Sequence, residues 1–234
     1  MISKKNSVSI VIPIYNEVEN IFNLVNEILS EIDNFLEYEI IIINDCSTDN
    51  FLDEFSNYES RNYINLQNNK KNLGQSKSIY YGVEIAKFEN IITLDGDGQN
   101  NPSDIKILCS KFFNENYSLV SGIRQKRKDS YLKKISSKLA NFIRDLVLHD
   151  NCPDTGCGLK IFKKNVFLKI PYFNGIHRFI PAIFVNMKEK VCYIDVDHRY
   201  RKYGYSKYGT IGRMFKGIID IIRVILIIRK LKND

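Results

Sequence analysis

Apolar and polar residues follow two different periods along the first part of the chain. Near-continuous apolar runs cover 7–15 and 38–45, which is typical of strands that are buried on both faces of a parallel sheet. Between these runs, the apolar residues fall on one face of a helix: Val18, Ile21, Phe22, Val25, Ile28, Leu29 and Ile32. This order predicts a strand, a helix and a second strand.

The alternation continues to about residue 122. Its pattern predicts strands over 61–68, 90–95 and 117–122, a helix over 74–88, and a helix start at 102–104. Strands that alternate with helices indicate an α/β fold, with a mostly parallel sheet flanked by helices.

Polar residues follow three of the predicted strands at the point where each strand ends. They lie in the segments 13–17, 44–49 and 95–99. Ligands of such sheets bind at the carboxyl ends of the strands, so we expect these segments to converge on one edge. One Asp after a strand is commonly a turn or cap residue. Three acidic strand ends at one edge instead indicate a binding site.

The third segment contains two carboxylates, Asp95 and Asp97, separated by one glycine. Residues two apart share a face in an extended chain, and we expect Gly96 and Gly98 to allow another group to come close. Neighbouring carboxylates repel each other unless a cation lies between them. A divalent ion such as Mg²⁺ or Mn²⁺, which takes oxygen ligands and shares them with phosphates, fits this pattern.

Composition narrows the class of protein. The chain has 234 residues, of which 44% are hydrophobic, so it can bury a core and is not a disordered protein. A net charge of +7 favours a polyanionic partner such as nucleotide phosphates or anionic lipid, although a basic solvated surface explains it equally well. No nucleic-acid partner is expected, because no motif of that kind is recognisable. Five irregularly spaced cysteines suit a reducing, cytoplasmic compartment.

The segment 211–234 has the pattern of an amphipathic helix. Nearly all of its residues before Arg229 are apolar. The exceptions are three or four residues apart and are Arg213, Lys216, Asp220 and Arg223. The segment is too short and too charged to span a bilayer, and it suits the interface of an anionic membrane. A helix packed on the domain or in a homo-oligomer interface is the alternative. We therefore expect a globular domain over 1–210 and a membrane-surface helix over 211–234.

Five motifs occur together in this sequence: VSIVIPIYNEVENI, NDCSTD, NLGQSKSIYYG, LDGDGQNNP and DTGCGLKIF. Their order and approximate spacing resemble the family-2 glycosyltransferases, specifically the polyprenyl-phosphate group that is similar to dolichol-phosphate mannose synthase. The resemblance extends from about residue 7 to about residue 210. It implies the GT-A fold, a Rossmann-like arrangement.

The resemblance also implies an activity. It is the inverting transfer of a sugar from a UDP- or GDP-linked donor to a polyprenyl phosphate such as undecaprenyl phosphate. The reaction would take place on the cytoplasmic face of the cell membrane, with the enzyme peripherally associated. A lipid monophosphate is already anionic at neutral pH, whereas a hydroxyl acceptor needs a general base. The alternative is therefore a glycosyltransferase of the same fold that acts on a hydroxyl of a glycan or small molecule.

The same resemblance implies the roles of particular residues. The donor nucleotide would be held by Pro13, Tyr15, Glu17, Asp45 and Asp95. The divalent metal, Mg²⁺ or Mn²⁺, would be held by Asp95, Asp97 and Gln99. Asn44 stands where the family usually has an acid, which leaves the nucleotide base undetermined.

The remaining roles concern the phosphates and catalysis. The acceptor phosphate or the donor diphosphate would be bound by Arg124, Lys133, Ser137, Arg201, Ser206 and Lys207, and the segment 198–209 would close over the donor. The catalytic residues would be Asp97, Asp154 and Arg124. Asp154 would either orient the acceptor or a basic side chain, or act as a base.

Overall fold

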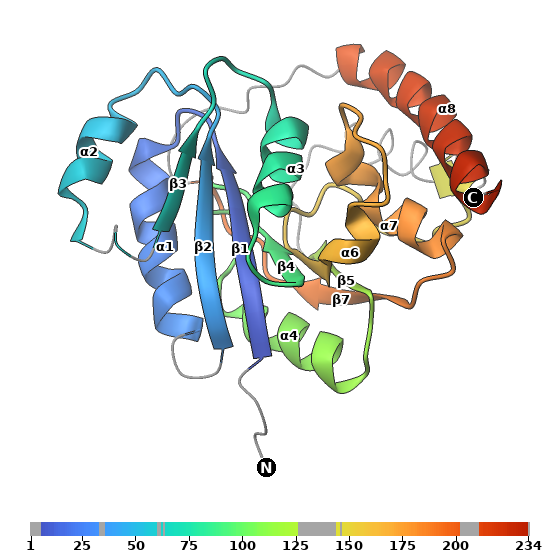
Figure 1. The fold of residues 1–234 in the computed structure, drawn as a ribbon, viewed down its shortest axis with the longest axis horizontal. Coiled ribbons are helices and arrows are strands. Elements are labelled where there is room, and N and C mark those ends of the chain that lie inside the picture. The colour runs from blue at the N-terminus through green and yellow to red at the C-terminus, as the bar shows by residue number, and fades with distance from the viewer. Residues whose placement is uncertain are drawn as a thin grey trace.

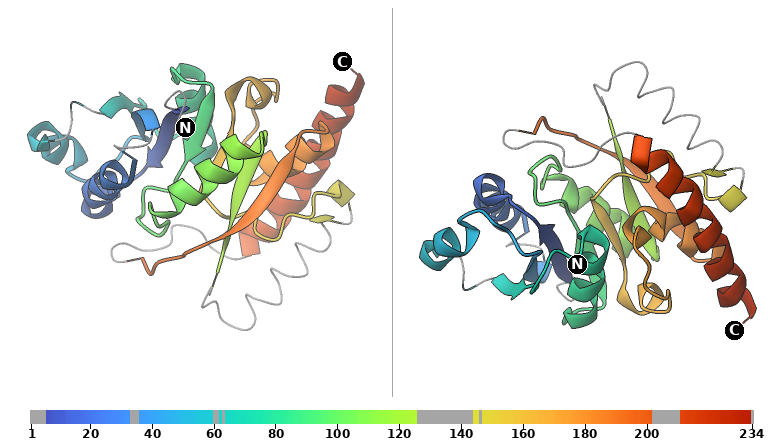
Figure 2. Two further views of the ribbon diagram at one scale, coloured as in Figure 1. Left: turned by 90° about the horizontal axis from the view of Figure 1, so that it is seen from below. Right: turned by 90° about the horizontal axis from the view of Figure 1, so that it is seen from above.

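A computed structural model describes residues 6–32, 36–59, 62, 64–125, 144–145, 147–201 and 211–233. These residues form one sheet with helices on both faces (Figures 1 and 2). The strands are β1 (Asn6–Ile14), β2 (Leu36–Asn44), β3 (Ile64–Asn68), β4 (Asn90–Thr93), β5 (Leu119–Arg124), β6 (Lys160–Lys163) and β7 (Val191–Val196). The helices are α1 (Val18–Ile32), α2 (Phe51–Asn57), α3 (Gln75–Ile85), α4 (Asp104–Asn114), α6 (Lys164–Phe167), α7 (Ile176–Asn186) and α8 (Ile211–Asn233).

The sheet has the strand order β3-β2-β1-β4-β6-β5-β7. Every neighbouring pair is parallel except the two pairs made by β6, which runs antiparallel to β4 and β5. The predicted mostly parallel α/β sheet is therefore confirmed. The strand and helix pattern did not predict β6 or β7.

Each face of the sheet is covered by its own apolar cluster. Ile10 and Ile12 of β1 pack in the cluster that includes α1 and α4, whereas Val11 between them packs in the cluster that includes α3 and α7. All three side chains are fully buried. The continuous apolar runs of the central strands follow from this burial on both faces.

The chain reverses its direction across the sheet at β1. It proceeds from β1 to β2 and β3 on one side, and then returns through α3 to β4 on the other side of β1 (Figure 1). Ligands of α/β sheets bind at such a switch point, beyond the carboxyl ends of the strands. The segments that follow β1, β2 and β4 meet there, as the sequence predicts.

Helix α8 packs along α7 at the end of the chain (Figures 1 and 2). Val224 and Ile228 are buried in the cluster beside α3 and α7. On the opposite side, Ile219, Ile222 and Leu226 are 58%, 55% and 59% exposed. Among the described residues, no helix combines the length and apolarity that crossing a membrane requires.

Candidate active site

Two carboxylates, Asp95 and Asp97, follow β4 at the switch point. The strand ends at Thr93 and residues 96–98 turn, so the extended spacing that the sequence suggested does not apply. The two groups interact all the same. Burial, and then the charge of Asp97, raise the pKa of Asp95 to about 6, and burial raises the pKa of Asp97. Two half-buried carboxylates whose pKa values are both raised favour a cation beside them.

The glycines around these carboxylates are required for different structural reasons. A Cβ on Gly96 would lie 2.6 Å from the Cγ2 atom of Ile14, so this glycine does permit a close approach. A Cβ on Gly98 would meet nothing within 4 Å, and this residue instead has a φ of +71° that favours glycine. A Cβ on Gly158 would lie 2.5 Å from the carboxyl carbon of Asp95. Gly158, which the sequence analysis missed, therefore makes room for Asp95.

Asp95 has two further neighbours that the sequence analysis did not assign. The side-chain amide of Gln75 donates to Asp95 Oδ1 at 2.7 Å. Lys160 is buried and donates to the carbonyl of Cys157, and its charge, followed by that of Arg124, lowers the pKa of Asp95 and offsets part of the effect of burial. Both residues lie in motifs of the sequence, NLGQSKSIYYG and DTGCGLKIF, but nothing in the motifs shows which side chains turn toward Asp95.

Gln99 completes the expected oxygen donors. Its backbone N–H donates to Asp97 Oδ1 at 3.1 Å, and its side-chain nitrogen donates to the carbonyl of Arg199 at 3.2 Å. Its side-chain oxygen accepts no hydrogen bond from the described residues.

The donor set suits Mg²⁺ or Mn²⁺. No group of three His, Cys, Asp or Glu side chains in the described part of the chain is placed to hold a metal ion. A metal at this loop would therefore be held by Asp95, Asp97 and the Gln99 oxygen together with ligands from outside the protein. Hard ions of this kind commonly share such a site with substrate phosphates.

Arg124, at the end of β5, is held by Asp154. Its Nε and Nη2 atoms donate to the two carboxylate oxygens at 2.7 and 2.8 Å, in a two-pronged pair. Asp154 also accepts from the backbone N–H groups of Arg124 and Gly156, each at 3.2 Å. A Cβ on Gly156 would lie 2.6 Å from Arg124 Nη2. Asp154 is only 6% exposed, and its contacts hold the guanidinium of Arg124 in one orientation.

Arg201, which follows β7, lies beside the carboxylates. Its guanidinium donates to Glu17, which follows β1, and Nη1 lies 3.9 Å from Asp97 Oδ2. The segment before it is bonded to the loop that carries Asp97 and Gln99, because the backbone N–H of Arg199 donates to the carbonyl of Gln99 at 2.9 Å. The expected neighbours Glu17, Asp97 and Arg201 are thus brought together.

Asp45, at the end of β2, organises the loop that leads to α3. Its Oδ1 accepts from the Asn69 side chain at 2.7 Å and from the Leu73 N–H at 2.8 Å, and its Oδ2 accepts from the Gly74 N–H at 2.7 Å. It is 3% exposed. In the structure both carboxylate oxygens of Asp45 therefore accept hydrogen bonds from the loop before α3, whereas the resemblance implies that Asp45 contacts the nucleotide.

Asn44 is also bonded within the protein. Its side-chain nitrogen donates to Asn68 Oδ1 at 2.8 Å, and its side-chain oxygen accepts from the Ser47 N–H at 3.0 Å. Of the other donor residues, Pro13 lies in β1, and Tyr15 follows that strand half-buried.

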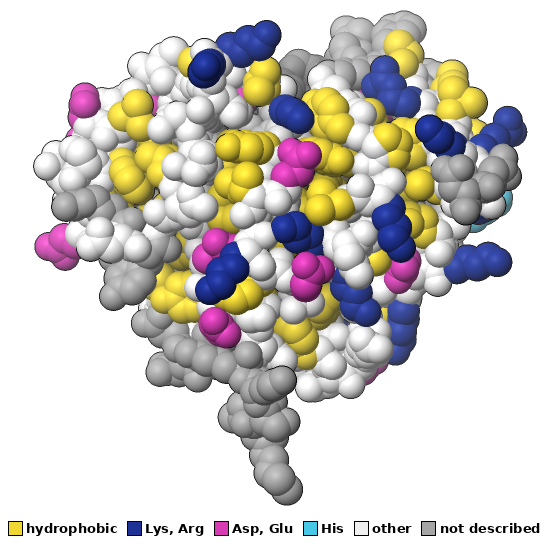
Figure 3. Space-filling model, viewed as in Figure 1, with side chains coloured by type: hydrophobic (Ala, Val, Ile, Leu, Met, Phe, Trp, Pro, Cys, Tyr) yellow, Lys and Arg dark blue, Asp and Glu magenta, His cyan; other side chains and the backbone are white. Residues whose placement is uncertain are grey.

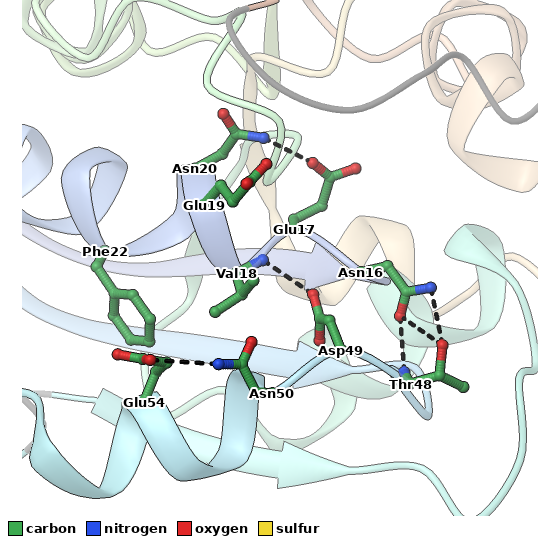
Figure 4. A pocket seen from close by; sticks show the side chains of 10 residues that line it. All are labelled: Asn16, Glu17, Val18, Glu19, Asn20, Phe22, Thr48, Asp49, Asn50 and Glu54. Carbon is green, nitrogen blue, oxygen red and sulfur yellow. Dashed lines mark hydrogen bonds between the residues drawn. The ribbon is translucent and has the colours of Figure 1, made fainter.

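A hollow of about 700 Å³ lies beside the ends of β1 and β2 (Figure 4). Its lining consists of Asn16, Glu17, Val18, Glu19, Asn20, Phe22, Thr48, Asp49, Asn50 and Glu54. Asp49 Oδ2 accepts from the Val18 N–H at 3.1 Å and so joins the β2 end to α1. The hollow shares Glu17 with the carboxylate cluster but contains neither Asp95 nor Asp97. Its four acidic side chains disfavour a phosphate there.

Four predicted site residues lie outside the described residues: Lys133, Ser137, Ser206 and Lys207. The predicted closing segment is described only as far as Arg201.

An α/β fold with carboxylates and arginines beyond its switch point is typical of enzymes that bind ligands at the carboxyl ends of the strands. The chain belongs to glycosyl transferase family 2, whose family profile matches residues 9–170. It is accordingly a glycosyltransferase.

Two relatives are similar over most of this chain. One is the dodecaprenyl-phosphate galacturonate synthase of Rhizobium johnstonii, with 32% identity over 94% of this chain and 67% of the relative. The other is the undecaprenyl-phosphate 4-deoxy-4-formamido-L-arabinose transferase of Proteus mirabilis, with 33% identity over 88% of this chain and 64% of the relative. The chain thus spans about two thirds of the length of these relatives.

Solved structures confirm the GT-A fold. Glucosyl-3-phosphoglycerate synthase of Mycobacterium tuberculosis, in complex with Mn²⁺, UDP and glucosyl-3-phosphoglycerate, superposes with a TM-score of 0.72 at 14% identity. The match covers 94% of this chain and 79% of that one. The complex of the same enzyme with Mn²⁺ and UDP-glucose gives a TM-score of 0.69 at 13% identity, over 94% of this chain and 78% of that one.

Proposed function

We propose that this glycosyltransferase transfers a sugar from a nucleotide-diphosphate sugar to a polyprenyl phosphate, with inversion at the anomeric carbon. An oxygen of the acceptor phosphate attacks the anomeric carbon while the bond to the donor diphosphate breaks, and the nucleoside diphosphate leaves. The two relatives, whose names specify dodecaprenyl and undecaprenyl phosphate, support this acceptor class. The sugar and the nucleotide base are left to experiment.

The hydrogen bonding of Asp154 is the main structural support for a phosphate acceptor. Its carboxylate is nearly fully covered, and the hydrogen bonds it accepts include two from the guanidinium of Arg124 and one each from the backbone N–H groups of Arg124 and Gly156. A hydroxyl acceptor needs a base that can take its proton. A phosphate monoester, with a second pKa of about 6, is already an anion and needs none. The arrangement therefore favours a phosphate acceptor over the hydroxyl alternative.

The donor end of the proposed site is acidic. Asp95, Asp97 and the oxygen of Gln99 would hold Mg²⁺ or Mn²⁺, which when bound neutralises charge on the donor diphosphate and stabilises the leaving group. Mn²⁺ and UDP occur together in the superposed synthase, which supports this part of the proposal. Glu17, Tyr15 and the other donor residues would then flank the nucleoside.

The basic side of the site would take the phosphates. Arg124 uses Nε and Nη2 on Asp154, so Nη1 is the edge that would meet a phosphate oxygen. Arg201 stands between Glu17 and Asp97 and would exchange part of that contact for the donor diphosphate. Lys133, Ser137, Ser206 and Lys207 are proposed phosphate contacts on the strength of the resemblance alone.

We place the reaction at an anionic membrane surface, on the cytoplasmic side. The outer side of α8 carries Ile219, Ile222 and Leu226, and its exposed charges over 219–232 are basic. Figure 3 shows hydrophobic and basic side chains over the described part of α8. A surface of this composition favours the headgroup region of an anionic bilayer.

One assay tests the function directly. The purified protein is incubated with a panel of UDP- and GDP-linked sugars, Mn²⁺ and undecaprenyl phosphate, and the lipid product is identified by mass. We expect one donor to give a glycosyl undecaprenyl phosphate. Transfer to a free sugar hydroxyl, with none to the lipid phosphate, would establish the hydroxyl alternative.

A further inference from the structure

A chain of polar contacts connects α8 with Asp95. It begins at Asp220 in α8, passes through the first turn of α7 and the first turn of α3, and ends at the Gln75 amide. Helix α7 contacts both α3 and α8 (Figure 1).

The first link joins α3 to Asp95. Helix α3 begins at Gln75, directly after Gly74, and has no side-chain cap. The Gln75 amide donates to Asp95 Oδ1 at 2.7 Å. A side chain on the first residue of a helix keeps its direction only if that turn is held in place. The position of the first turn of α3 therefore determines how Gln75 meets Asp95.

The second link holds that turn from the side of α7. Ser76 is 2% exposed. Its Oγ accepts from the Gly175 N–H at 2.8 Å and lies 2.8 Å from His177 Nδ1. A hydroxyl can donate one hydrogen bond and accept two, so Ser76 can satisfy both partners at once. Ser76 thus joins the first turns of α3 and α7.

The third link joins α7 to α8. Arg178 Nη2 donates to Asp220 Oδ2 at 2.6 Å, and Arg223 Nη1 lies 3.4 Å from Asp220 Oδ1. Asp220 is 1% exposed. A Cβ on Gly175 would lie 3.0 Å from Asp220 Oδ2 and 3.1 Å from Arg178 Nη2, so the start of α7 fits closely against this ion pair. A buried carboxylate with a cationic partner holds that partner in one position.

We propose that Ser76 and Asp220 are positioning residues for the metal-site carboxylate: Asp220 fixes the start of α7 through Arg178, and Ser76 passes that position on to Gln75 and Asp95. The helix assigned to the membrane surface and the carboxylate assigned to the metal then belong to one hydrogen-bonded unit. The geometry stands without the proposed acceptor, although the membrane role of α8 rests on the proposed function.

The test compares variants at the middle and at the α8 end of the chain of contacts with a control variant in α3. Ser76→Ala removes the central hydroxyl, Asp220→Asn removes the α8 carboxylate at constant shape, and Glu84→Gln changes an exposed carboxylate of α3. Hydrogen exchange of the amides of 73–79 in metal-free protein reports the first turn of α3. Titration with Mn²⁺ alone reports the carboxylates.

We expect Ser76→Ala and Asp220→Asn each to accelerate exchange over 73–79 and to weaken Mn²⁺ binding about fivefold, the lower end of couplings between separate sites. Ser76→Thr, which keeps the hydroxyl, should restore both properties, and Glu84→Gln should alter neither. In the Ser76→Ala/Asp220→Asn double variant the two effects should not add, because both changes break the same chain of contacts.

Asp220→Asn leaves Arg178 without its buried carboxylate; if this variant does not fold, Ser76→Ala carries the test alone. Unchanged exchange and Mn²⁺ affinity in Ser76→Ala would overturn the proposal, and so would fully additive effects in the double variant. Neither readout requires sugar transfer, so a failure of the proposed acceptor remains distinguishable from a failure of this inference.

Discussion

Asp95 bears a carboxylate whose ionisation the fold opposes. Burial and the neighbouring Asp97 raise its pKa from 3.8 to about 6, although Lys160, Arg124 and the Gln75 amide act in the other direction. The folded protein therefore binds this proton more tightly than the unfolded chain does. Between pH 3.8 and about 6, the contribution of Asp95 to the stability of the fold falls as pH rises. Above that range Asp95 is ionised, and the fold loses the full amount of stability that burying this charge requires.

Removing that charge should stabilise the metal-free protein at neutral pH. We expect Asp95→Asn to raise the free energy of unfolding by up to about 3 kcal/mol above pH 6, with a gain that shrinks as pH falls toward 4. Urea unfolding in EDTA at several pH values measures it, with the exposed Asp53→Asn as the control. A gain of the same size at every pH would contradict a titrating origin.

Asp154 should affect the rate of transfer without setting its pH dependence. Loss of the two-pronged contact in Asp154→Asn frees Arg124, and we expect kcat/KM to fall about 10- to 100-fold, as is usual for misplaced site groups. The fall of kcat/KM at acidic pH should remain in the variant, because protonation of the acceptor phosphate causes it.

A phosphonate acceptor with a higher second pKa separates this fall of kcat/KM from the ionisation of Asp95. With that analogue the fall should move to higher pH in both wild type and Asp154→Asn. If the fall stays in place, the acceptor's ionisation does not produce it. A folded Asp154→Asn that binds both substrates and is inactive at every pH would identify Asp154 as a base.

At the scale of elements, α8 has two unlike sides. Val224 and Ile228 are buried against the domain, and Asp220 is held by Arg178. Ile222 and Leu226 are more than half exposed. The inner side contributes to the fold and the outer side does not, so the outer side can be altered while the domain remains intact.

Charges on the outer side should therefore impair membrane contact alone. We expect Ile222→Glu with Leu226→Glu to reduce sedimentation with anionic liposomes and transfer to long-chain acceptor, because burial of each apolar side chain is worth about 1.5–3 kcal/mol. Transfer to a short, water-soluble acceptor should be retained.

Leu52→Glu in α2 and Ile107→Glu in α4 are matched controls, since these residues are 51% and 55% exposed elsewhere on the domain. They should leave liposome binding unchanged. Equal losses in all of these variants would mean that α8 has no special contact with lipid.

At the scale of the whole molecule, the site joins segments that lie far apart in the sequence. Glu17, which follows the first strand, pairs with Arg201, and Asp95 lies against Gly158. A ligand that contacts both the carboxylates and the arginines therefore binds only the folded domain. Such a ligand stabilises the fold by mass action.

Metal and nucleotide together should raise the melting temperature. At one hundred times the dissociation constant the gain is about 2.7 kcal/mol, or roughly 5–10 °C for a domain of this size. We expect this shift with Mn²⁺ and either UDP or GDP in a thermal scan, and its loss on addition of EDTA. Asp97→Asn should show no shift, and an equal shift in that variant would argue against a metal at this loop.

The local pattern was sufficient for the first half of the fold. Strands β1 to β4 and helices α1 and α3 have strong apolar periods, and their order alone implies adjacent carboxyl ends where Glu17, Asp45 and Asp95 follow. The start of α4 was also apparent from the residues at 102–104. Local sequence determines these elements because the spacing of the apolar side chains determines which of them share a face, and that face is the one the fold buries.

Only the tertiary structure decided which side chains meet. Strand β6 inserts antiparallel between β4 and β5, and this places Gly158 and Lys160 beside Asp95. The contacts of four further residues likewise arise only where α3, α7 and α8 pack together, and no local pattern in the sequence predicts them: Gln75, Ser76, His177 and Asp220. Contacts between distant segments follow from how whole elements pack, and no periodicity along the chain encodes them.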